Sequence, residues 1–382
     1  MALITYVTRV QFDFGALSLL AEELELAGIR RPLLVTDKGI VAAGLLDRVR
    51  NALPARLPLA VFDETPPNPT EAAVRAAVSA YRAHEADGII GLGGGSPLDL
   101  AKAVAVAATH PGGALKQYAV IEGGLNRITA AVAPSIAIPT TSGTGSEVSR
   151  GAIIVLDDGR KVSIGSPYLL PKAAICDPEL TFGLPPLLTA ATGMDAITHC
   201  IEAYLSPRVN PVADAIGLDG LARGWRHIQC ATTDGSDRTA RWEMMMASME
   251  GAMAFQKGLG AVHALAHPLG GLPAPPVLHH GTLNAVLLPH VLRFNAATVP
   301  ERICTLGIAM GLEDTRPEAV ADAITTLAAR LGLPASLGAM GVPRAVLPAM
   351  AAAAMRDHCH PTNPREASEA DYLALLEAAY AG

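Results

Sequence analysis

The chain has 382 residues, 50% of them hydrophobic but only 4% aromatic, a length and composition that fit two domains with aliphatic cores. A net charge of −7 at pH 7, without any run of like charges, argues against nucleic acid as a partner. Five scattered cysteines without a Cys-x-x-Cys pair, the lack of a secretory signal and the lack of an apolar run that could cross a bilayer favour a cytoplasmic protein with free thiols and no membrane partner.

The first half of the chain alternates short apolar runs with alanine-rich stretches of helical composition. The predicted strands cover residues 31–37, 88–92 and 135–139, and the predicted helices between them cover 69–86 and 97–108. This alternation is typical of a parallel sheet covered by helices. A hairpin is also predicted, with strands at 152–155 and 161–164 around a turn at 157–159. We therefore predict an α/β domain with a parallel sheet over residues 1–182.

The second half loses these strand signals after Pro185 and Pro186. The sequence that follows is rich in alanine, leucine and methionine. Helices are predicted over residues 187–205, 214–227 and 241–255, and through the remainder of the chain. The stretch from Pro273 to Pro276 is predicted to be a loop, because no helix could cross so many prolines. The prediction is an all-helical domain over residues 183–382.

A glycine turn, Gly93 to Ser96, joins a predicted strand to a predicted helix. Ser96 is the predicted N-cap, with Pro97 at the first helical position and Asp99 at the third. Glycines allow backbone N–H groups to approach an anion at the positive end of a helix. The spacing differs from the usual dinucleotide fingerprint, so a plain strand-to-helix turn remains an alternative. A second small polar turn, 140–147, could contact a ribose or nicotinamide, or could be a plain loop.

Pairs of potential metal ligands recur at helical spacing. Asp195 and His199 lie four residues apart, as do His263 and His267, and the doubled histidine 279–280 follows. A spacing of four puts two side chains on one helix face. One carboxylate and three imidazoles that converge would bind a divalent cation. A single histidine on an apolar helix is more often structural, but this combination favours a metal site.

These segments make the chain resemble the iron-containing (group III) alcohol dehydrogenases, the family of lactaldehyde:propanediol oxidoreductase and 1,3-propanediol dehydrogenase. The resemblance extends from about Val35 to Tyr380. The motifs that carry it are Gly93–Lys102, Pro139–Val148, Asp177–Thr181, Gly193–Glu202, His263–Gly270 and Asp357–Arg365. It implies an N-terminal α/β dinucleotide-binding domain, a C-terminal all-helical metal-binding domain and an active site in the cleft between them.

The resemblance also implies the roles of the histidines. His267 would be a catalytic histidine near the nicotinamide that does not bind the metal. His279 is the lesser candidate for the fourth ligand, because the loop before it is longer than in the propanediol enzymes. The cation would be Fe²⁺, with Zn²⁺ or Mn²⁺ also possible. Its implied ligands are Asp195, His199, His263 and His280.

The implied cofactor is NAD. Asp37 would bind the adenosine ribose hydroxyls and repel a 2′-phosphate, which favours NAD(H) over NADP(H). Gly151 stands where larger residues usually line the substrate pocket, which implies extra room. The other predicted cofactor-binding residues are Asn68, Gly94, Gly95, Ser96, Asp99, Thr140, Thr141, Thr144 and Lys161.

The expected activity is NAD(H)- and metal-dependent interconversion of a primary alcohol and an aldehyde by hydride transfer. We expect a homodimer or a higher homo-oligomer. The alternative is a metal- and NAD-dependent lyase or synthase related to dehydroquinate synthase, which would need a pocket rich in lysine and arginine. A third hypothesis is a protein without catalytic activity that senses a nucleotide or a metal.

Overall fold

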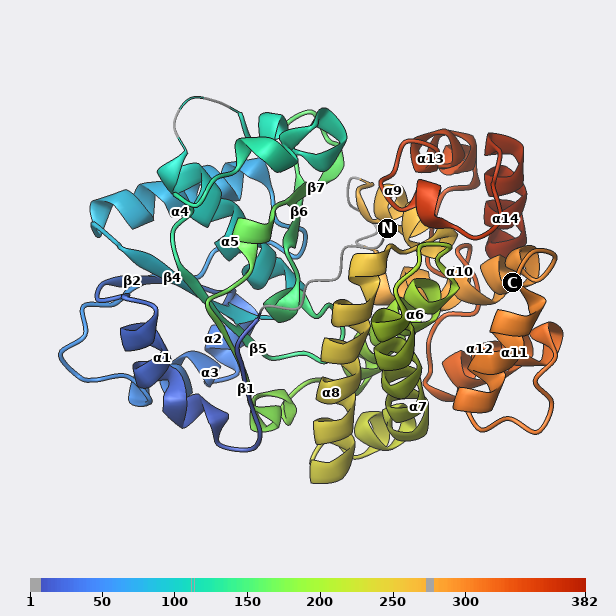
Figure 1. Cartoon of the computed structure of the whole chain (residues 1–382), viewed down its shortest axis with the longest axis horizontal. Coiled ribbons are helices and arrows are strands. Elements are labelled where there is room, and N and C mark those ends of the chain that lie inside the picture. The colour runs from blue at the N-terminus through green and yellow to red at the C-terminus, as the bar shows by residue number, and fades with distance from the viewer. Residues whose placement is uncertain (1–7, 111, 113, 273–277) are drawn as a thin grey trace. The chain divides into compact units, whose positions relative to one another are not determined.

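The computed structural model describes residues 8–110, 112, 114–272 and 278–382. These residues divide into two compact units (Figure 1). Residues 8–141 and 145–183 form the first, here named the sheet unit. Residues 184–382, joined by Ser142–Thr144, form the second, here named the helical unit. The predicted loop from Pro273 to Pro276 lies outside the described residues.

The sheet unit is built on a parallel sheet, which confirms the predicted fold class. The predicted strands appear as β2 (Pro32–Val35), β4 (Gly88–Gly93) and β5 (Ser135–Pro139), while β1 (Val10–Phe12), β3 (Ala60–Phe62) and β8 (Ala173–Cys176) were not predicted. Among the described residues the order is β1-β8-β5-β4-β2-β3, and every neighbouring pair is parallel. The predicted hairpin is also present, as β6 (Gly151–Val155) and β7 (Lys161–Gly165).

Helices cover both faces of the sheet (Figure 1). The helices α4 (Glu71–Ala83) and α5 (Gly95–Thr109) pack with Leu33 and Ile89 on one face. The adjacent residues Leu34 and Ile90 point to the opposite face, because side chains alternate along a strand. That face is covered by α1 (Leu20–Leu26) and α3 (Leu45–Asn51), with the short α2 (Lys38–Ala42) between them in sequence. Burial on both faces explains the continuous apolar runs of the central strands.

The order in which the strands follow one another across the sheet reverses between β2 and β4. From β2 the connection leads to β3 at one edge, whereas from β4 the chain continues through β5 and β8 toward the other edge. The strands β2 and β4 are paired, with Val35 opposite Gly91. Ligands of open α/β sheets bind beyond the carboxyl ends of the strands at such a reversal. Asp37 and the glycine turn follow these two carboxyl ends.

The helical unit contains helices and, among its described residues, no strand, as predicted. Every residue of α6 from Thr189 to Leu205 is buried, and α7, α8 and α10 pack against this helix. The helices are α6 (Pro186–Leu205), α7 (Pro211–Thr233), α8 (Arg238–Ala254), α9 (Ala261–Gly270), α10 (His280–Asn295), α11 (Pro300–Ala309), α12 (Pro317–Arg330), α13 (Leu347–Ala354) and α14 (Glu369–Ala381).

Short 3₁₀ helices connect the main elements of both units. They are η1 (Ala16–Leu19), η2 (Leu115–Tyr118), η3 (Val120–Glu122), η4 (Gly124–Arg127), η5 (Ser146–Val148), η6 (Pro167–Leu169), η7 (Pro178–Thr181), η8 (Phe255–Lys257), η9 (Arg344–Val346) and η10 (His360–Thr362).

Gly281 lets α10 approach α6 closely. A Cβ atom at this position would lie only 2.0 Å from the carbonyl oxygen of Ala191. No other residue type fits such a contact without moving one of the two helices. The contact positions His280, the first residue of α10, beside the buried face of α6.

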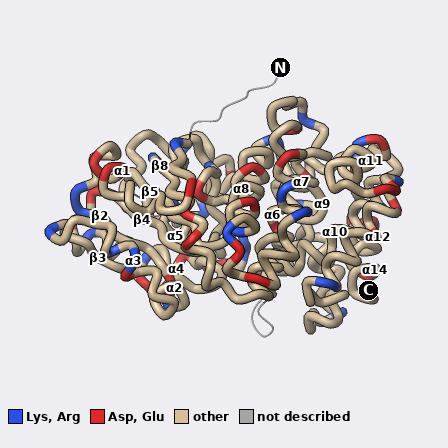
Figure 2. The backbone as a smooth tube through the Cα atoms, turned by 90° about the horizontal axis from the view of Figure 1, so that it is seen from below, with Lys and Arg blue, Asp and Glu red and all other residues tan. Residues whose placement is uncertain are grey.

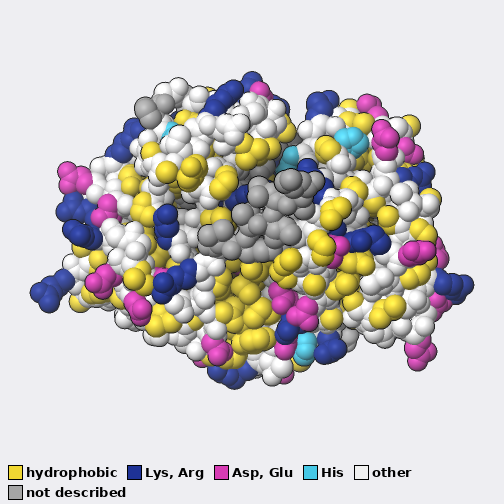
Figure 3. All heavy atoms as spheres, in the orientation of Figure 1, with side chains coloured by type: hydrophobic (Ala, Val, Ile, Leu, Met, Phe, Trp, Pro, Cys, Tyr) yellow, Lys and Arg dark blue, Asp and Glu magenta, His cyan; other side chains and the backbone are white. Residues whose placement is uncertain are grey.

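Charged residues are distributed over both units. Figure 2 shows basic and acidic residues in each unit, and on the face drawn in Figure 3 the two signs are mixed. No surface of one sign dominates that face. Within the described parts of the chain, every helix is too short or too polar to span a membrane.

Candidate metal and cofactor sites

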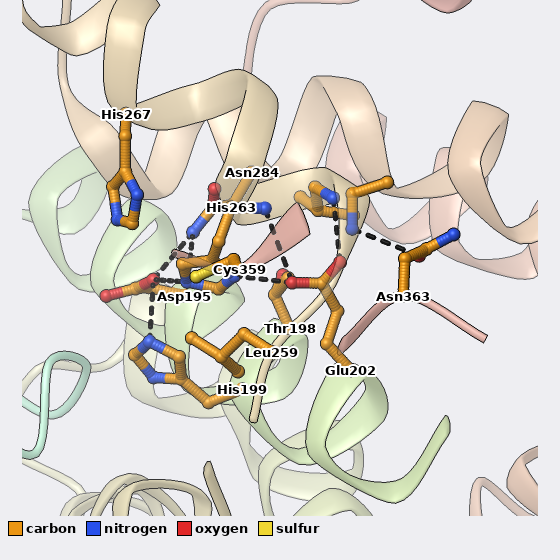
Figure 4. A network of polar contacts seen from close by, with 12 residues as sticks. Asp195, Thr198, His199, Glu202, Leu259, His263, His267, Asn284, Cys359 and Asn363 are labelled. Carbon is orange, nitrogen blue, oxygen red and sulfur yellow. Dashed lines mark hydrogen bonds and ion pairs between the residues drawn. The ribbon is translucent and has the colours of Figure 1, made fainter. Parts of the chain in front are cut away.

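Three of the predicted ligands, all histidines, surround one carboxylate oxygen of the fourth, Asp195, in the helical unit. Figure 4 shows two of them, His199 and His263, beside Asp195. Helix α6 carries Asp195 and His199, and Nε2 of His199 lies 3.6 Å from Oδ1 of Asp195. Nε2 of His263, on α9, and Nε2 of His280, on α10, each lie 3.7 Å from the same oxygen. Side chains from three helices therefore place three imidazole nitrogens around one carboxylate.

The other ring nitrogens of two of these histidines are engaged. Nδ1 of His263 lies 2.6 Å from Oε2 of Glu202, and Nδ1 of His199 lies 3.2 Å from the carbonyl oxygen of Gly143. With Nδ1 engaged in this way, Nε2 is the ring nitrogen that faces Asp195, and in the neutral imidazole it carries the lone pair that a metal would bind. Carboxylates and carbonyls hold metal-binding imidazoles in this way. Glu202 and Gly143 were not predicted as members of the site.

Asn284 contacts three of the four predicted ligands, and Figure 4 shows its side chain beside Asp195. Its Nδ2 lies 2.7 Å from Oδ1 of Asp195 and 3.3 Å from Nε2 of both His263 and His280. The side chain is fully buried, and its carbonyl oxygen accepts no hydrogen bond among the described residues. An electropositive amide thus occupies the point that the ligand atoms face. One carboxylate with three neutral imidazoles is a donor set that fits Fe²⁺, Zn²⁺ or Mn²⁺.

The electrostatics of this cluster favour a cation. Burial lowers the pKa of His199 to about 4, so its imidazole is neutral at pH 7. Burial would raise the pKa of Asp195, but the neighbouring histidines outweigh it and lower that pKa, which keeps the carboxylate ionised. Burial also lowers the pKa of His263, but its hydrogen bonds to Asp195 and Glu202 raise it to about 9. Two buried carboxylates thus attract positive charge.

His267 lies beside this cluster but is held by a different partner. Its Nδ1 lies 2.9 Å from Oδ2 of Asp357, a residue that was not predicted as part of the site. The imidazole stacks on the ring of His280 at 5.4 Å and on the ring of His358 at 5.3 Å, measured between ring centroids. The bond to Asp357 leaves Nε2 as the ring nitrogen that can exchange a proton.

The start of α9 is capped by side chains from distant segments. Gly260, its N-cap residue, provides no side chain for this purpose. Instead, Oδ1 of Asn363 accepts the N–H of Ala261 at 3.0 Å, and Oε1 of Glu202 accepts the N–H of Val262 at 2.7 Å. Glu202 therefore fixes both the first turn of α9 and the ring of His263.

The glycine turn in the sheet unit begins α5 earlier than predicted. The prediction that Ser96 is the N-cap is wrong: the N-cap is Gly94, without a capping side chain, and the helix starts at Gly95. The Ser96 hydroxyl donates instead to the carbonyl of Pro67. Gly93 adopts φ +145°, which other residues rarely adopt. No capping side chain at Gly94 takes up the first N–H groups of α5, and a helix start of this kind can bind a phosphate.

The structure brings most of the predicted cofactor residues to the carboxyl edge of the sheet. Asp37 caps α2 through a 2.9 Å bond from the N–H of Ile40, which engages one carboxylate oxygen. Thr140 donates its N–H to the carbonyl of Gly93 at 3.0 Å, and Thr141 would be 3.3 Å from a Cβ atom at Gly94.

Asn68 and Lys161 are joined to each other by a 2.9 Å hydrogen bond from Nζ to Oδ1. Two other predicted cofactor-binding residues, Asp99 and Thr144, differ from these residues in what surrounds them. Asp99 uses both carboxylate oxygens inside the sheet unit, where they accept from the Ser146 hydroxyl at 2.6 Å and from the N–H of Ile153 at 2.9 Å. Thr144 belongs to the helical unit.

Comparison with known proteins establishes the family. Residues 7–178 match the family model of iron-containing alcohol dehydrogenase, and residues 189–380 match that of the Fe-containing alcohol dehydrogenase family, C-terminal. The chain belongs to the iron-containing alcohol dehydrogenase family. The predicted resemblance is confirmed, and membership favours an oxidoreductase over the lyase and sensor hypotheses.

Individual relatives extend over nearly the whole chain. A 4-hydroxybutyrate dehydrogenase of Cupriavidus necator is 60% identical over 383 residues, which cover 99% of each protein. The crystal structure of a 1,3-propanediol oxidoreductase has a TM-score of 0.91 and 38% identity, and covers 99% of this chain and 100% of that one. A sulfoacetaldehyde reductase of Bifidobacterium kashiwanohense, solved in complex with NAD⁺, has a TM-score of 0.87 and 26% identity, and covers 99% of both chains.

Proposed function

We propose that this protein is an NAD(H)- and divalent-metal-dependent dehydrogenase that interconverts a primary alcohol and its aldehyde, with 4-hydroxybutyrate as the alcohol. The observation that carries the metal dependence is the convergence of Asp195, His199, His263 and His280 on one point. The choice of 4-hydroxybutyrate rests on the relative that is 60% identical over the full chain. We propose Fe²⁺ as the native cation, with Zn²⁺ or Mn²⁺ as replacements.

The residues around the proposed cation have separate tasks. The cation supplies Lewis acidity toward an alcohol or carbonyl oxygen, and the nicotinamide accepts or donates the hydride. Glu202 and Gly143 hold two imidazoles with Nε2 toward the cation. His267, oriented by Asp357, holds or moves the alcohol proton at its Nε2 atom.

We further propose that residues 1–182 bind NAD and residues 183–382 bind the metal. The N-terminus of α5, led by glycines, would receive the pyrophosphate at the sheet reversal between β2 and β4. Asp37, which follows β2, would receive the ribose hydroxyls and exclude a 2′-phosphate. A related reductase was solved with NAD⁺, which agrees with this cofactor.

Turnover and metal content, measured together, test the proposed function. Wild-type protein loaded with Fe²⁺ or Zn²⁺ should produce NADH from 4-hydroxybutyrate and NAD⁺, and less from 1-butanol at equal concentration, since 1-butanol lacks the carboxylate. His263→Ala should lose both metal and turnover, because a missing ligand weakens binding and geometry together. His290→Ala, in a histidine of α10 outside the cluster, is the matched control. Normal metal content and rate in His263→Ala would refute the assignment.

The doubled histidine needs its own comparison. His280→Ala should cost far more metal affinity than His279→Ala, because Nε2 of His280 lies 3.7 Å from Oδ1 of Asp195. The opposite order would transfer the ligand role to His279.

The proton role of His267 is separable from metal binding. His267→Ala should retain the metal but change the pH dependence of kcat. An unchanged pH profile with only a raised KM would leave His267 a packing role against the nicotinamide. Loss of the metal would instead make His267 a ligand.

A further inference from the structure

A second group of metal-ligating side chains lies next to the proposed catalytic site. His267 on α9 and the three consecutive residues Asp357, His358 and Cys359 each offer one ligand atom, and these atoms all lie within 4.8 Å of one another. None of the four is among the proposed catalytic ligands. Their combination of imidazole, carboxylate and thiol differs from that site mainly by the sulfur.

The distances within this group already approach those of a four-coordinate site. Nδ1 of His267 lies 2.9 Å from Oδ2 of Asp357, and Nε2 of His358 lies 3.5 Å from Sγ of Cys359. In a tetrahedral zinc complex neighbouring ligand atoms are about 3.3–3.8 Å apart, given the usual bond lengths. The atoms therefore need movements of only a fraction of an ångström to about one ångström to surround a cation.

The backbone holds this group in place. The carboxylate of Asp357 accepts the N–H of Cys359 at 2.8 Å, which fixes the turn between them. The ring of His358 stacks on that of His267 at 5.3 Å, with the ring planes inclined by 13°. Two neutral imidazoles, one carboxylate and one thiolate would neutralise a divalent cation, so a buried complex would carry no net charge.

Burial differs across the group in a way that suits metal uptake. Cys359 is 2% exposed, whereas the side chain of His358 is 32% exposed. A cation can thus meet His358 first and then exchange water for the buried sulfur. Binding would release the thiol proton to solvent, because the thiolate is the ligand.

We propose that His267, Asp357, His358 and Cys359 form a second binding site for a thiophilic divalent cation, with Zn²⁺ as the cation that fits best. The thiolate favours Zn²⁺ over Mg²⁺, Ca²⁺ or Mn²⁺, and four mixed N, O and S ligands suit its tetrahedral preference. Occupation draws Nδ1 of His267 away from Asp357 and onto the cation. Zinc at this site thereby changes the orienting partner of the histidine beside the catalytic centre.

Cobalt identifies this site, because only a sulfur ligand gives a thiolate-to-Co²⁺ charge-transfer absorption in the near ultraviolet. Chelator-treated wild-type protein titrated with Co²⁺ should develop that absorption, and zinc saturation should give two ions per chain. Cys359→Ser should abolish the absorption and leave one zinc. Asp195→Asn should keep the absorption, because it removes only a ligand of the catalytic site. Cys304→Ser, in a partly buried cysteine of α11, is the matched control and should behave like wild type.

His358→Gln keeps the test decisive should Cys359→Ser fold poorly, because it alters the exposed side of the group and leaves the sulfur in place. It should weaken Co²⁺ binding, read from the sulfur absorption, roughly tenfold or more. A wild-type protein that binds one zinc and shows no sulfur absorption overturns the proposal. An absorption that survives Cys359→Ser, that develops with the wild-type Co²⁺ affinity in His358→Gln, or that disappears in Cys304→Ser, overturns it as well.

Discussion

Glu202→Gln separates the two tasks of one buried carboxylate. Its two oxygens accept from Nδ1 of His263 at 2.6 Å and from the N–H groups of Val262 at 2.7 Å and of His263 at 3.3 Å. Glutamine offers one oxygen and one NH₂ group, so it cannot accept on both sides. One buried donor must lose its partner, which costs about 1–3 kcal/mol. Where the imidazole loses its acceptor, metal affinity should fall about 10–100-fold, or about 1.4–2.8 kcal/mol.

Two measurements on the same protein check this reasoning. Competition with a chelator gives the metal affinity, and urea unfolding of the metal-free protein gives the loss of stability. Glu301→Gln, in an exposed glutamate of α11, is the control and should change neither value. A variant that loses stability but binds metal within twofold of wild type would show that Glu202 only caps α9. A variant unchanged in both would refute the role of Glu202 altogether.

Three further predictions concern pH, packing and cofactor choice. Burial and the nearby Asp219 raise the pKa of Glu250 to about 8, so its protonation stabilises the fold fully below the unfolded pKa of about 4.3 and less as pH rises through about 8. Glu250→Gln should therefore leave the free energy of unfolding nearly unchanged at about pH 4 but raise it by about 1–3 kcal/mol at about pH 9, as measured by urea unfolding. An equal change in unfolding free energy at both pH values would contradict this. Gly281→Ala should lower the free energy of unfolding by about 3 kcal/mol in the same assay, because its Cβ would lie 2.0 Å from the carbonyl oxygen of Ala191. A urea midpoint equal to that of wild type would show that α10 can move away from α6 at little cost. Asp37→Gly should lower the ratio of kcat/KM with NAD⁺ to kcat/KM with NADP⁺. Equal kcat/KM values for the two cofactors in the wild-type protein would disprove the proposed role of this carboxylate.

The helices and central strands could be predicted because the order of apolar and polar residues within each of them reflects which of its side chains are buried. The strands β2, β4 and β5 are buried on both faces and read as apolar runs. By contrast, β8 (Ala173–Cys176) has three small residues and a single β-branched side chain, Ile175. Only its position between β5 and β1 makes it a strand, and that pairing is not visible along the sequence. The three-residue β1 and β3 are too short to show any period.

Asp195 and His199 could be paired from the sequence because a spacing of four is a local signal. The choice of His263 and His280 rested on the family resemblance, and the hydrogen-bond partners of these side chains come from elsewhere in the chain. Asp357 lies 90 residues from His267, and Asn284 lies 89 residues from Asp195. Glu202 had a usable signal, since it stands three residues after His199 on the same buried helix. The N-cap at Ser96 was misplaced because serine is the better capping residue by propensity, whereas the helix here begins at the glycines themselves.

The capping of α9 has a consequence for the order of events during biosynthesis. Its first turn depends on Glu202, 60 residues before Val262, and on Asn363, 102 residues after Ala261. His263 leaves the ribosome long before Asn363 is translated, so the nascent chain carries this imidazole on a helix whose start is not yet held. A metal ion present at that stage would meet a cluster in which the helix that carries His263 is not yet capped at its start. If the proposed cation binds here, we expect its site to be complete only after Asn363 has left the ribosome.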